Sequence, residues 1–406
     1  MRKVKWDAFL SGLCGFAAVL GVVAAGARAD VTTESGASIL VFPKIQANGT
    51  FDTVIQIANT GNSMLHAHCF YVDASLSSTL SGFPCSVPSA TCLPSWQETD
   101  FLIWLTKQQP THWLASKGRN IDPTDGFKDD GSGFDPGRIP PVTDGFIGEL
   151  KCIEVSESDE PITGNHLKGE ATLEVVATTS GSLGDTGSAY KWDVSAPGTQ
   201  KGDVSKYNAI GILGNPDVQP SNPLLLDDQV YNACPSKIIL NHFATGAEDP
   251  IAKDLEDSGA PIVYSSVATE LTLVPCSEDF ENQQPKSVTI QFLIYNELEQ
   301  RFSASTTVTC FLSVELTKID SPGAPTRSAF SSNFLGTDVA HTEITPVANV
   351  DGTTGGLVGV AERIVSVTSI TGTASARAAY NLHTEGSLVP DPAVAPPDQI
   401  LLPATE

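Results

Sequence analysis

The segment MLHAHCFYVD, residues 64–73, gathers two histidines and one cysteine within four positions, in a chain that has only 7 histidines. On a β-strand, neighbouring side chains point to opposite faces, so His66 and His68 share one face and Cys69 lies on the other. Two imidazoles at this spacing can hold one divalent metal ion if a third ligand comes from elsewhere. No particular third ligand is evident. We therefore favour an ordinary strand with Cys69 in a core disulfide, and a metal site at the histidines is the alternative.

Acidic residues interleaved with glycine offer a second candidate metal site, within fourteen residues: Asp122, Asp125, Asp129, Asp130 and Asp135. Calcium takes about 6–8 oxygen ligands, and glycine allows the backbone to curl around the ion. The spacing differs from that of an EF-hand loop, and acidic linkers without metal have the same composition. We expect no cofactor, with calcium in this loop as the alternative.

Tryptophan is concentrated just before this loop, where three of the 5 in the chain lie within eighteen residues: Trp96, Trp104 and Trp113. An exposed indole beside polar side chains can stack on a sugar ring, which makes Trp104 and Trp113 candidate ligand-binding residues. Alternation in DFLIWLT instead places Phe101 and Ile103 on a core face opposite Trp104. Packing in a core or between domains is the favoured interpretation, and sugar binding is the alternative.

Local catalytic signatures are missing from the sequence. It contains no G-x-S-x-G elbow, no H-E-x-x-H, no G-x-x-x-x-G-K and no C-x-x-C. A dispersed active site leaves no such local pattern. The sequence therefore favours a non-enzymatic protein without deciding the matter.

The first 29 residues have the pattern of an export signal. Three basic residues near the start precede an apolar run over residues 9–25, and Ala27 and Ala29 supply the small side chains typical of a cleavage site. We expect cleavage before Asp30, and an N-terminal membrane anchor is the alternative. The predicted location is secreted, either extracellular or at the cell surface, with the periplasm as a further alternative.

The balance of charge limits the partners. The formal net charge is -24, and removal of residues 1–29 takes away four basic residues and one acidic residue, which leaves about -27. A field of this sign repels nucleic acid and anionic lipid. We expect other proteins or surface polymers as partners, no nucleic acid, and contact with a membrane only during export. Self-association is a further expectation.

Cysteine usage agrees with export, because cysteines pair in an oxidising compartment. The mature chain would keep seven of the 8 cysteines, so one thiol is left over. Cys85 and Cys92 enclose the short segment SVPSAT between two prolines, and we predict a disulfide between them. Two further predicted pairs are chosen from many arrangements: Cys69 with Cys152, and Cys276 with Cys310.

Apolar and polar side chains alternate along several segments, which indicates half-buried strands. In SVTIQFLIY, the aligned apolar residues are Val288, Ile290, Phe292 and Ile294. The segment STTVTCFLSVEL behaves likewise and is predicted to form one strand over residues 305–316. No long segment has strong helical periodicity. Short strands and frequent turns predict a mainly β protein of two or three antiparallel β-sandwich domains with long Gly/Pro/Asp-rich loops.

Breaks in composition suggest where these domains begin and end. After the signal at 1–29, we expect a β-sandwich over 30–115, an Asp/Gly-rich loop or linker over 116–145, and a second β-sandwich over 146–320. A C-terminal β segment over 335–390 and a Pro-rich tail over 391–406 complete the chain.

The N-terminal segment carries the clearest turn signals. SILVFPKI leads to Asn48-Gly49, a strong hairpin signal, then to FDTVIQIA, and a second turn, NTGN at residues 59–62, leads into the segment discussed first. We predict a three-strand meander over residues 38–73. Its strand–NTGN–strand pattern resembles hairpins of bacterial extracellular immunoglobulin-like domains. The resemblance implies an immunoglobulin-like β-sandwich and nothing about activity.

Together these observations predict an exported, non-enzymatic, cell-surface or extracellular structural or adhesive protein that acts through its β surfaces. One alternative is a secreted protein that binds or processes carbohydrate through its tryptophans. The other is a calcium-binding extracellular protein that uses the aspartate-rich loop.

Overall fold

The computed structural model describes residues 31–78, 80–81, 91–120, 135–175, 198–199, 204–257, 259, 262–348, 354–369, 372–390 and 395–404. The predicted export signal lies outside these ranges. So do Cys85 and four of the five aspartates of the predicted calcium loop, Asp122, Asp125, Asp129 and Asp130.

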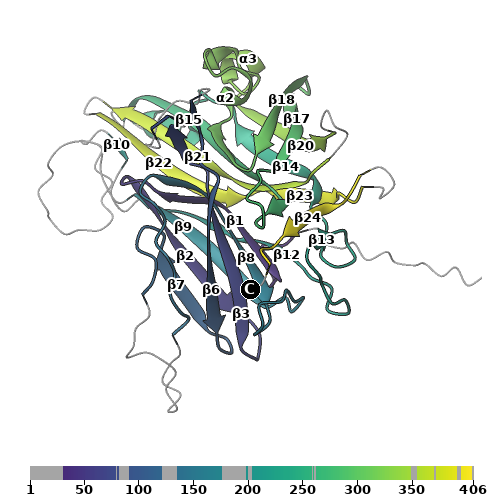
Figure 1. Ribbon diagram of the computed structural model, residues 1–406. Coiled ribbons are helices and arrows are strands. Elements are labelled where there is room, and N and C mark those ends of the chain that lie inside the picture. The colour runs from purple at the N-terminus through teal and green to yellow at the C-terminus, as the bar shows by residue number, and fades with distance from the viewer. Residues whose placement is uncertain are drawn as a thin grey trace, which may run out of the picture.

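The prediction of a mainly β protein is confirmed (Figure 1). Helices in the described residues are short: α1 (Pro250–Asp257), α2 (Thr317–Asp320), the 3-10 helix η1 (Pro325–Arg327) and α3 (Ser332–Leu335). None of these described helices has the length and apolar character needed to cross a bilayer.

Two sheets contain most of the N-terminal half. In order, the strands of sheet I are β12 (Ile210–Ile212), β1 (Ile39–Ala47), β8 (Phe146–Val155), β3 (Leu65–Asp73) and β6 (Gln97–Leu105). The strands of sheet II are β11 (Val204–Asn208), β9 (Leu167–Val175), β2 (Phe51–Asn59) and β7 (Pro110–Leu114). A separate two-stranded ribbon consists of β4 (Leu76–Ser78) and β5 (Cys92–Pro94).

Three further sheets contain most of the C-terminal half. The strands of sheet III are β10 (Gly198–Thr199), β22 (Gly372–Asn381), β21 (Leu357–Ser369), β15 (Ile262–Pro275) and β19 (Leu312–Glu315). Those of sheet IV are β18 (Arg301–Thr309), β17 (Ser287–Asn296), β20 (Val339–Val347), β14 (Pro235–Phe243) and β23 (His383–Ser387). Sheet V consists of β13 (Leu224–Leu226), β24 (Asp398–Leu401) and β16 (Glu278–Asp279), so the predicted Pro-rich tail supplies its central strand.

The prediction of successive immunoglobulin-like β-sandwich domains is wrong. Apart from the ribbon, the described strands form five small sheets of three to five strands, and single sheets combine strands from distant parts of the chain. In sheet I, β8 from the predicted second domain lies between β1 and β3 of the predicted first domain, and β12 extends the sheet beyond β1. The range 30–115 therefore does not close a sheet by itself, and 116–145 does not separate two independent units.

The predicted three-strand meander is also wrong, although its first turn forms. The backbone N–H of Asn48 donates to the carbonyl of Phe51 at 3.0 Å, and Gly49 has a φ of 75°. The two flanking strands nevertheless separate, because β1 lies in sheet I and β2 in sheet II, and β3 returns to sheet I. All nine residues of β1 are buried. A strand covered on both faces cannot be half of a hairpin with one solvated face.

The described residues form three hydrophobic clusters, and the first two cover the middle of sheet I on its two faces. The first lies between sheets I and II and includes Phe42 and Ile55. The second lies on the other face of sheet I, against sheet V and one end of sheet III, and includes Phe70 and Phe280. The third lies between sheets III and IV. Figure 1 shows sheets I and II in the lower half of the molecule and sheets III and IV in the upper half.

The predicted strand over residues 305–316 is divided between two sheets. β18 ends at Thr309 in sheet IV, and β19 begins at Leu312 in sheet III. Between them, Cys310 has a positive φ of 52°, which interrupts the extended backbone. Val308 and Leu316 both belong to the third cluster. The two ends of the segment therefore pack in the same cluster, whereas the residues of β19 between them are all half-buried.

Candidate functional site

One corner of sheet I is left uncovered by sheet V. The register pairs His66 of β3 with Trp104 of β6, and His68 with Leu102. These side chains share the face of sheet I that Phe280 covers further along β3, where its ring stacks on Phe70 at 4.1 Å. We call the uncovered corner the platform, and its residues are His66, His68, Asp100, Leu102 and Trp104.

Trp104 is the most prominent residue of the platform. Its side chain is 46% exposed, and the neighbouring Leu102 is 40% exposed. The indole stacks on the imidazole of His66 with 5.0 Å between ring centroids and an angle of 12° between planes. The backbone N–H of Trp104 donates to the carbonyl of Pro136 at 3.0 Å, which holds the outer edge of β6. The indole is thus exposed and also held in one orientation.

His68 is fixed beside it by two carboxylates. Its Nε2 lies 3.0 Å from Oδ2 of Asp100, and its Nδ1 lies 3.1 Å from Oδ1 of Asp159, in the turn after β8. Its ring also stacks on Phe70 at 4.3 Å. Asp100 remains largely exposed, so its carboxylate can still accept hydrogen bonds from a ligand.

The histidines do share one face of a strand, as predicted, but their surroundings differ. Both ring nitrogens of His68 face carboxylates, those of Asp100 and Asp159. The ring of His66 stacks on Trp104, and its Nε2 is buried without a hydrogen-bond partner among the described residues. Across the described ranges, no group of three or more His, Cys, Asp or Glu side chains could hold a metal ion.

Trp113 belongs to the core and not to a surface. It is 2% exposed, and its Nε1–H donates to the hydroxyl of Tyr71 at 2.6 Å. Its ring meets Phe101 edge to face. Burial raises the pKa of Tyr71, since an ionised phenolate would lose its solvation there. The structure therefore separates the two candidate tryptophans into one exposed residue and one core residue.

Of the predicted calcium ligands, Asp135 is the one within the described residues. Its Oδ1 lies 3.5 Å from Nε of Arg119, and its side chain is mostly buried. Asp135 thus has a cationic partner. The calcium prediction for the loop stays a prediction, because its other aspartates lie outside the described ranges.

The cysteines follow the predictions in part. Cys69 and Cys152 form a disulfide between the neighbouring strands β3 and β8, as predicted. The predicted pair of Cys276 and Cys310 is wrong, because Cys276 is bonded to Cys234 and Cys310 is free and buried. Cys92 is disulfide-bonded, and its predicted partner Cys85 lies outside the described residues. Disulfides of this kind are typical of an oxidising compartment.

Sequence reasoning missed a buried ion cluster between the two halves of the molecule. Nζ of Lys44 on β1 lies 2.6 Å from Oε1 of Glu270 on β15 and also contacts Glu362 on β21. Arg377 on β22 lies 3.2 Å from both carboxylates. Burial alone would raise the pKa of Glu270, but Lys44 and Arg377 lower it to about 2. One signal for this cluster was available, namely a single lysine inside the apolar strand ILVFPKIQA.

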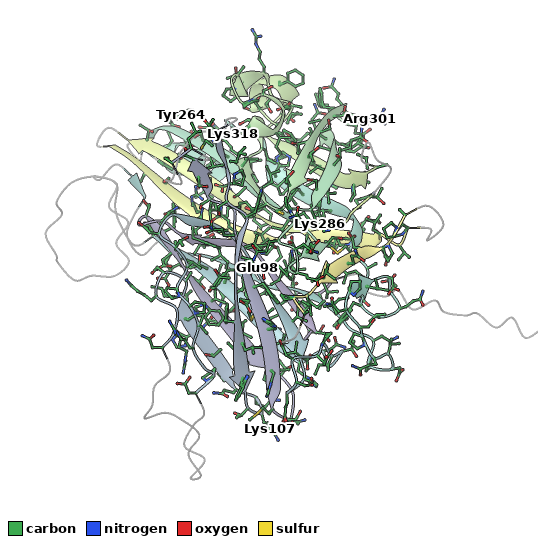
Figure 2. All side chains as sticks on the ribbon, in the orientation of Figure 1. Glu98, Lys107, Tyr264, Lys286, Arg301 and Lys318 are labelled. Carbon is green, nitrogen blue, oxygen red and sulfur yellow. A yellow bond between two sulfur atoms is a disulfide. The ribbon has the colours of Figure 1, made fainter. Side chains whose placement is uncertain are left out.

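A second buried ion cluster was also missed. Nζ of Lys151 on β8 lies 3.0 Å from Glu149 on the same strand and 3.1 Å from Glu278 of sheet V. Burial raises the pKa of Glu149 to about 8, although the charge of Lys151 opposes this. Burial, and then the charges of Asp100, Glu278 and Asp279, also raises the pKa of nearby Glu98 to about 8. Figure 2 shows Glu98 near the boundary between the two halves.

Two open grooves lie on outer faces of the sheets. One, of about 430 Å³, is on sheet II and is lined in part by His112, Lys168 and Glu170. The other, of about 380 Å³, is on sheet IV and is lined in part by Tyr295 and His341. Neither contains a residue singled out from the sequence. The platform is therefore where the structure brings predicted residues together, because His66, His68 and Trp104 all belong to it.

Comparisons with known proteins add no identification. No family model matches the chain, and no curated protein matches it. The crystal structure of tripeptidyl peptidase 2 is similar at 8% identity and a TM-score of 0.18, over 87% of this chain and 29% of that one. A "putative secreted protein" from Parabacteroides distasonis is similar at 11% identity and a TM-score of 0.14, over 88% and 92% of the two chains. The chain spans less than a third of the length of the peptidase. At such TM-scores neither likeness bears on fold or function.

Proposed function

We propose that this chain is an exported, non-enzymatic protein of the cell surface or extracellular space that binds a neutral polysaccharide through the platform. One observation carries the proposal: Trp104 is exposed on a sheet face, and its indole stacks on the imidazole of His66. A pyranose ring presents C–H groups on one face, and these pack on an aromatic ring. The exposed carboxylate of Asp100 can accept hydrogen bonds from sugar hydroxyls at the edge of the stack.

The rest of the chain supports an extracellular binding protein. The disulfides suit an oxidising compartment. The formal net charge of -24 disfavours anionic polymers and leaves neutral ones as the better partners. A stack on a preformed ring costs little ordering entropy, so that even one sugar contact can contribute to affinity.

The test compares two exposed aromatic residues on different sheets. The wild type, Trp104→Ala and Tyr264→Ala would be run in gels containing soluble glucan, mannan, xylan or galactan. Tyr264 is 55% exposed and lies on β15 of sheet III, whereas the platform lies on sheet I; Figure 2 shows Tyr264 in the upper half of the molecule. We expect at least one polymer to retard the wild type and Tyr264→Ala, and Trp104→Ala to bind about 10-fold more weakly, which corresponds to the loss of one stack. Retardation that is equal in all three proteins would overturn the proposal.

A second measurement separates binding from processing. The retarding polymer would be incubated with the protein and assayed for new reducing ends. We expect none to form. Release of reducing ends that Asp100→Asn abolishes would replace the binding proposal with a glycoside hydrolase, since such enzymes act through paired carboxyl groups.

A further inference from the structure

The edges of the sheets differ in how they are protected. Several edge strands have at most five residues, namely β12, β7, β19 and β23. At the outer edge of β6, the backbone N–H of Trp104 donates to the carbonyl of Pro136. β18 is nine residues long, and within the described part of the chain β17 is the only strand that pairs with it. Figure 2 shows Arg301, its first residue, at the outer margin of the molecule.

The composition of β18 lacks the usual protection of an edge. Natural edge strands carry charges, proline or bulges, or are covered by a helix or loop, and these features prevent pairing with another chain. α2 lies beside β18, and Phe334 of α3 meets Phe302 edge to face, but apart from β17 no described residue bonds to the backbone of residues 301–308. In β18, RFSASTTVT, the one charged residue is Arg301, and the seven residues Ser303 to Thr309 contain no charge, proline or glycine. This neutral stretch stands out in a chain with a formal net charge of -24. Because of this net charge, two copies of the chain repel each other over most of their surfaces, but the neutral stretch of β18 adds no charge of its own to that repulsion.

At one end of this hairpin the outward side chains of both strands carry hydroxyl groups. Thr307 Oγ1 lies 3.2 Å from Thr289 Oγ1 of β17, and Thr309 Oγ1 lies 2.9 Å from Ser287 Oγ. Ser and Thr side chains opposite each other on neighbouring strands form favourable cross-strand pairs. The same type of pair can form across the open edge if the incoming strand has the same composition.

We propose that β18 is a dimer interface at which it pairs antiparallel with β18 of a second copy of this chain. Pairing centred on Ser305 places Ser303 opposite Thr307 and Arg301 opposite Thr309. No two like charges then face each other, and sheets IV of the two copies join into one continuous sheet. The pairing uses the same edge in both copies, so it closes at two chains and does not propagate. This inference is independent of the proposed sugar binding, because the platform lies on sheet I.

The test uses a charge at the centre of the contact and a charge exchange. Sedimentation of the wild-type mature chain should show dimers whose fraction rises with concentration below about 1 mM. Ser305→Lys should reduce the association constant at least about 10-fold, because the two lysines would face each other. Thr289→Lys, with the same charge change on the inner strand β17, should retain the dimer. A mixture of Ser305→Lys and Ser305→Glu should form a heterodimer again, which also shows that both variants fold.

Three outcomes would overturn the inference. One is a wild-type chain that stays monomeric throughout this range, including the case in which β18 instead binds a strand of another protein. Another is a dimer that Ser305→Lys leaves unchanged. The last is a mixture of the Lys and Glu variants that shows no heterodimer.

Discussion

The ammonium group of Lys44 on β1 lies 2.6 Å from Oε1 of Glu270 on β15, and this contact crosses from sheet I to sheet III. Lys44 is fully buried and also contacts Glu362, which is itself 2% exposed. Such a charge is stable in the interior only while its partners are present. The buried cluster therefore fixes how the two halves of the molecule are placed against each other.

Replacing Lys44 with methionine should destabilise the protein strongly. The substitution keeps most of the volume and leaves two carboxylates with Arg377 as their remaining cation. Removal of one partner from a buried pair costs about 3–5 kcal/mol. Urea unfolding would measure the loss. The exposed Lys253→Met, which removes a surface contact with Glu248, should leave the midpoint unchanged. A double variant with Glu362→Gln should recover part of the loss, and no recovery would count against an electrostatic cause.

Stability should fall as the pH rises from about 4.5 to about 8, because of Glu149. Burial raises its folded-state pKa to about 8, above the ordinary value of 4.5. The folded state then holds a proton that the unfolded state loses, so this contribution is complete below about pH 4.5 and is lost as the pH rises through about 8. Across that window the free energy of unfolding would fall by at most about 1.4 kcal/mol per pH unit.

The matched variant for this effect is Glu149→Gln, which cannot ionise. Melting temperatures of wild type and variant would be compared from pH 5 to pH 9, and the expected result is a smaller decline in the variant. The lowered pKa of Glu270 affects stability between about pH 2 and pH 4.5, below this range. Parallel curves would show that Glu149 carries no proton in the folded state.

The features that the sequence could predict are those set by residues close together in the chain. Alternation identified β17, whose Val288, Ile290 and Phe292 are all buried, and it placed Trp104 opposite Phe101 on β6. Turn chemistry located the bend at Gly49. These features depend on residues only a few positions apart.

Sheet membership could not be predicted, because it depends on distant residues. β1 and β2 meet at a strong hairpin turn, yet their neighbours β8 and β9 come from residues 146–175. Packing between the sheets decides which sheet each strand joins. The spacing of residue types within residues 38–73 does not indicate this choice. The disulfide partner of Cys276 was missed for the same reason. Adjacent strands brought Cys69 to Cys152, whereas Cys234 lies directly before β14 and meets Cys276 through packing in the second cluster.

The two tryptophans should respond differently to truncation. Trp113→Ala removes a ring buried against Phe101 and leaves the hydroxyl of Tyr71 without its donor. Loss of a large core aromatic costs about 3–5 kcal/mol. Trp104→Ala, at an exposed position, should change the free energy of unfolding by no more than about 0.5 kcal/mol. Urea titration of both variants would check this, and equal losses would mean that Trp104 is part of the core.

Thiol counting can decide the pairing of Cys276. With Cys85 and Cys92 paired as predicted, the mature chain should react at one thiol in denaturant and at none in the native state, because Cys310 is buried and its pKa is raised by burial. Cys310→Ser should then show no thiol in denaturant. If Cys310 were instead bonded to Cys276, the same variant would show two thiols, from Cys276 and Cys234. Cys234→Ser should expose the thiol of Cys276 and lower stability by about 2–4 kcal/mol, as expected for removal of a native disulfide.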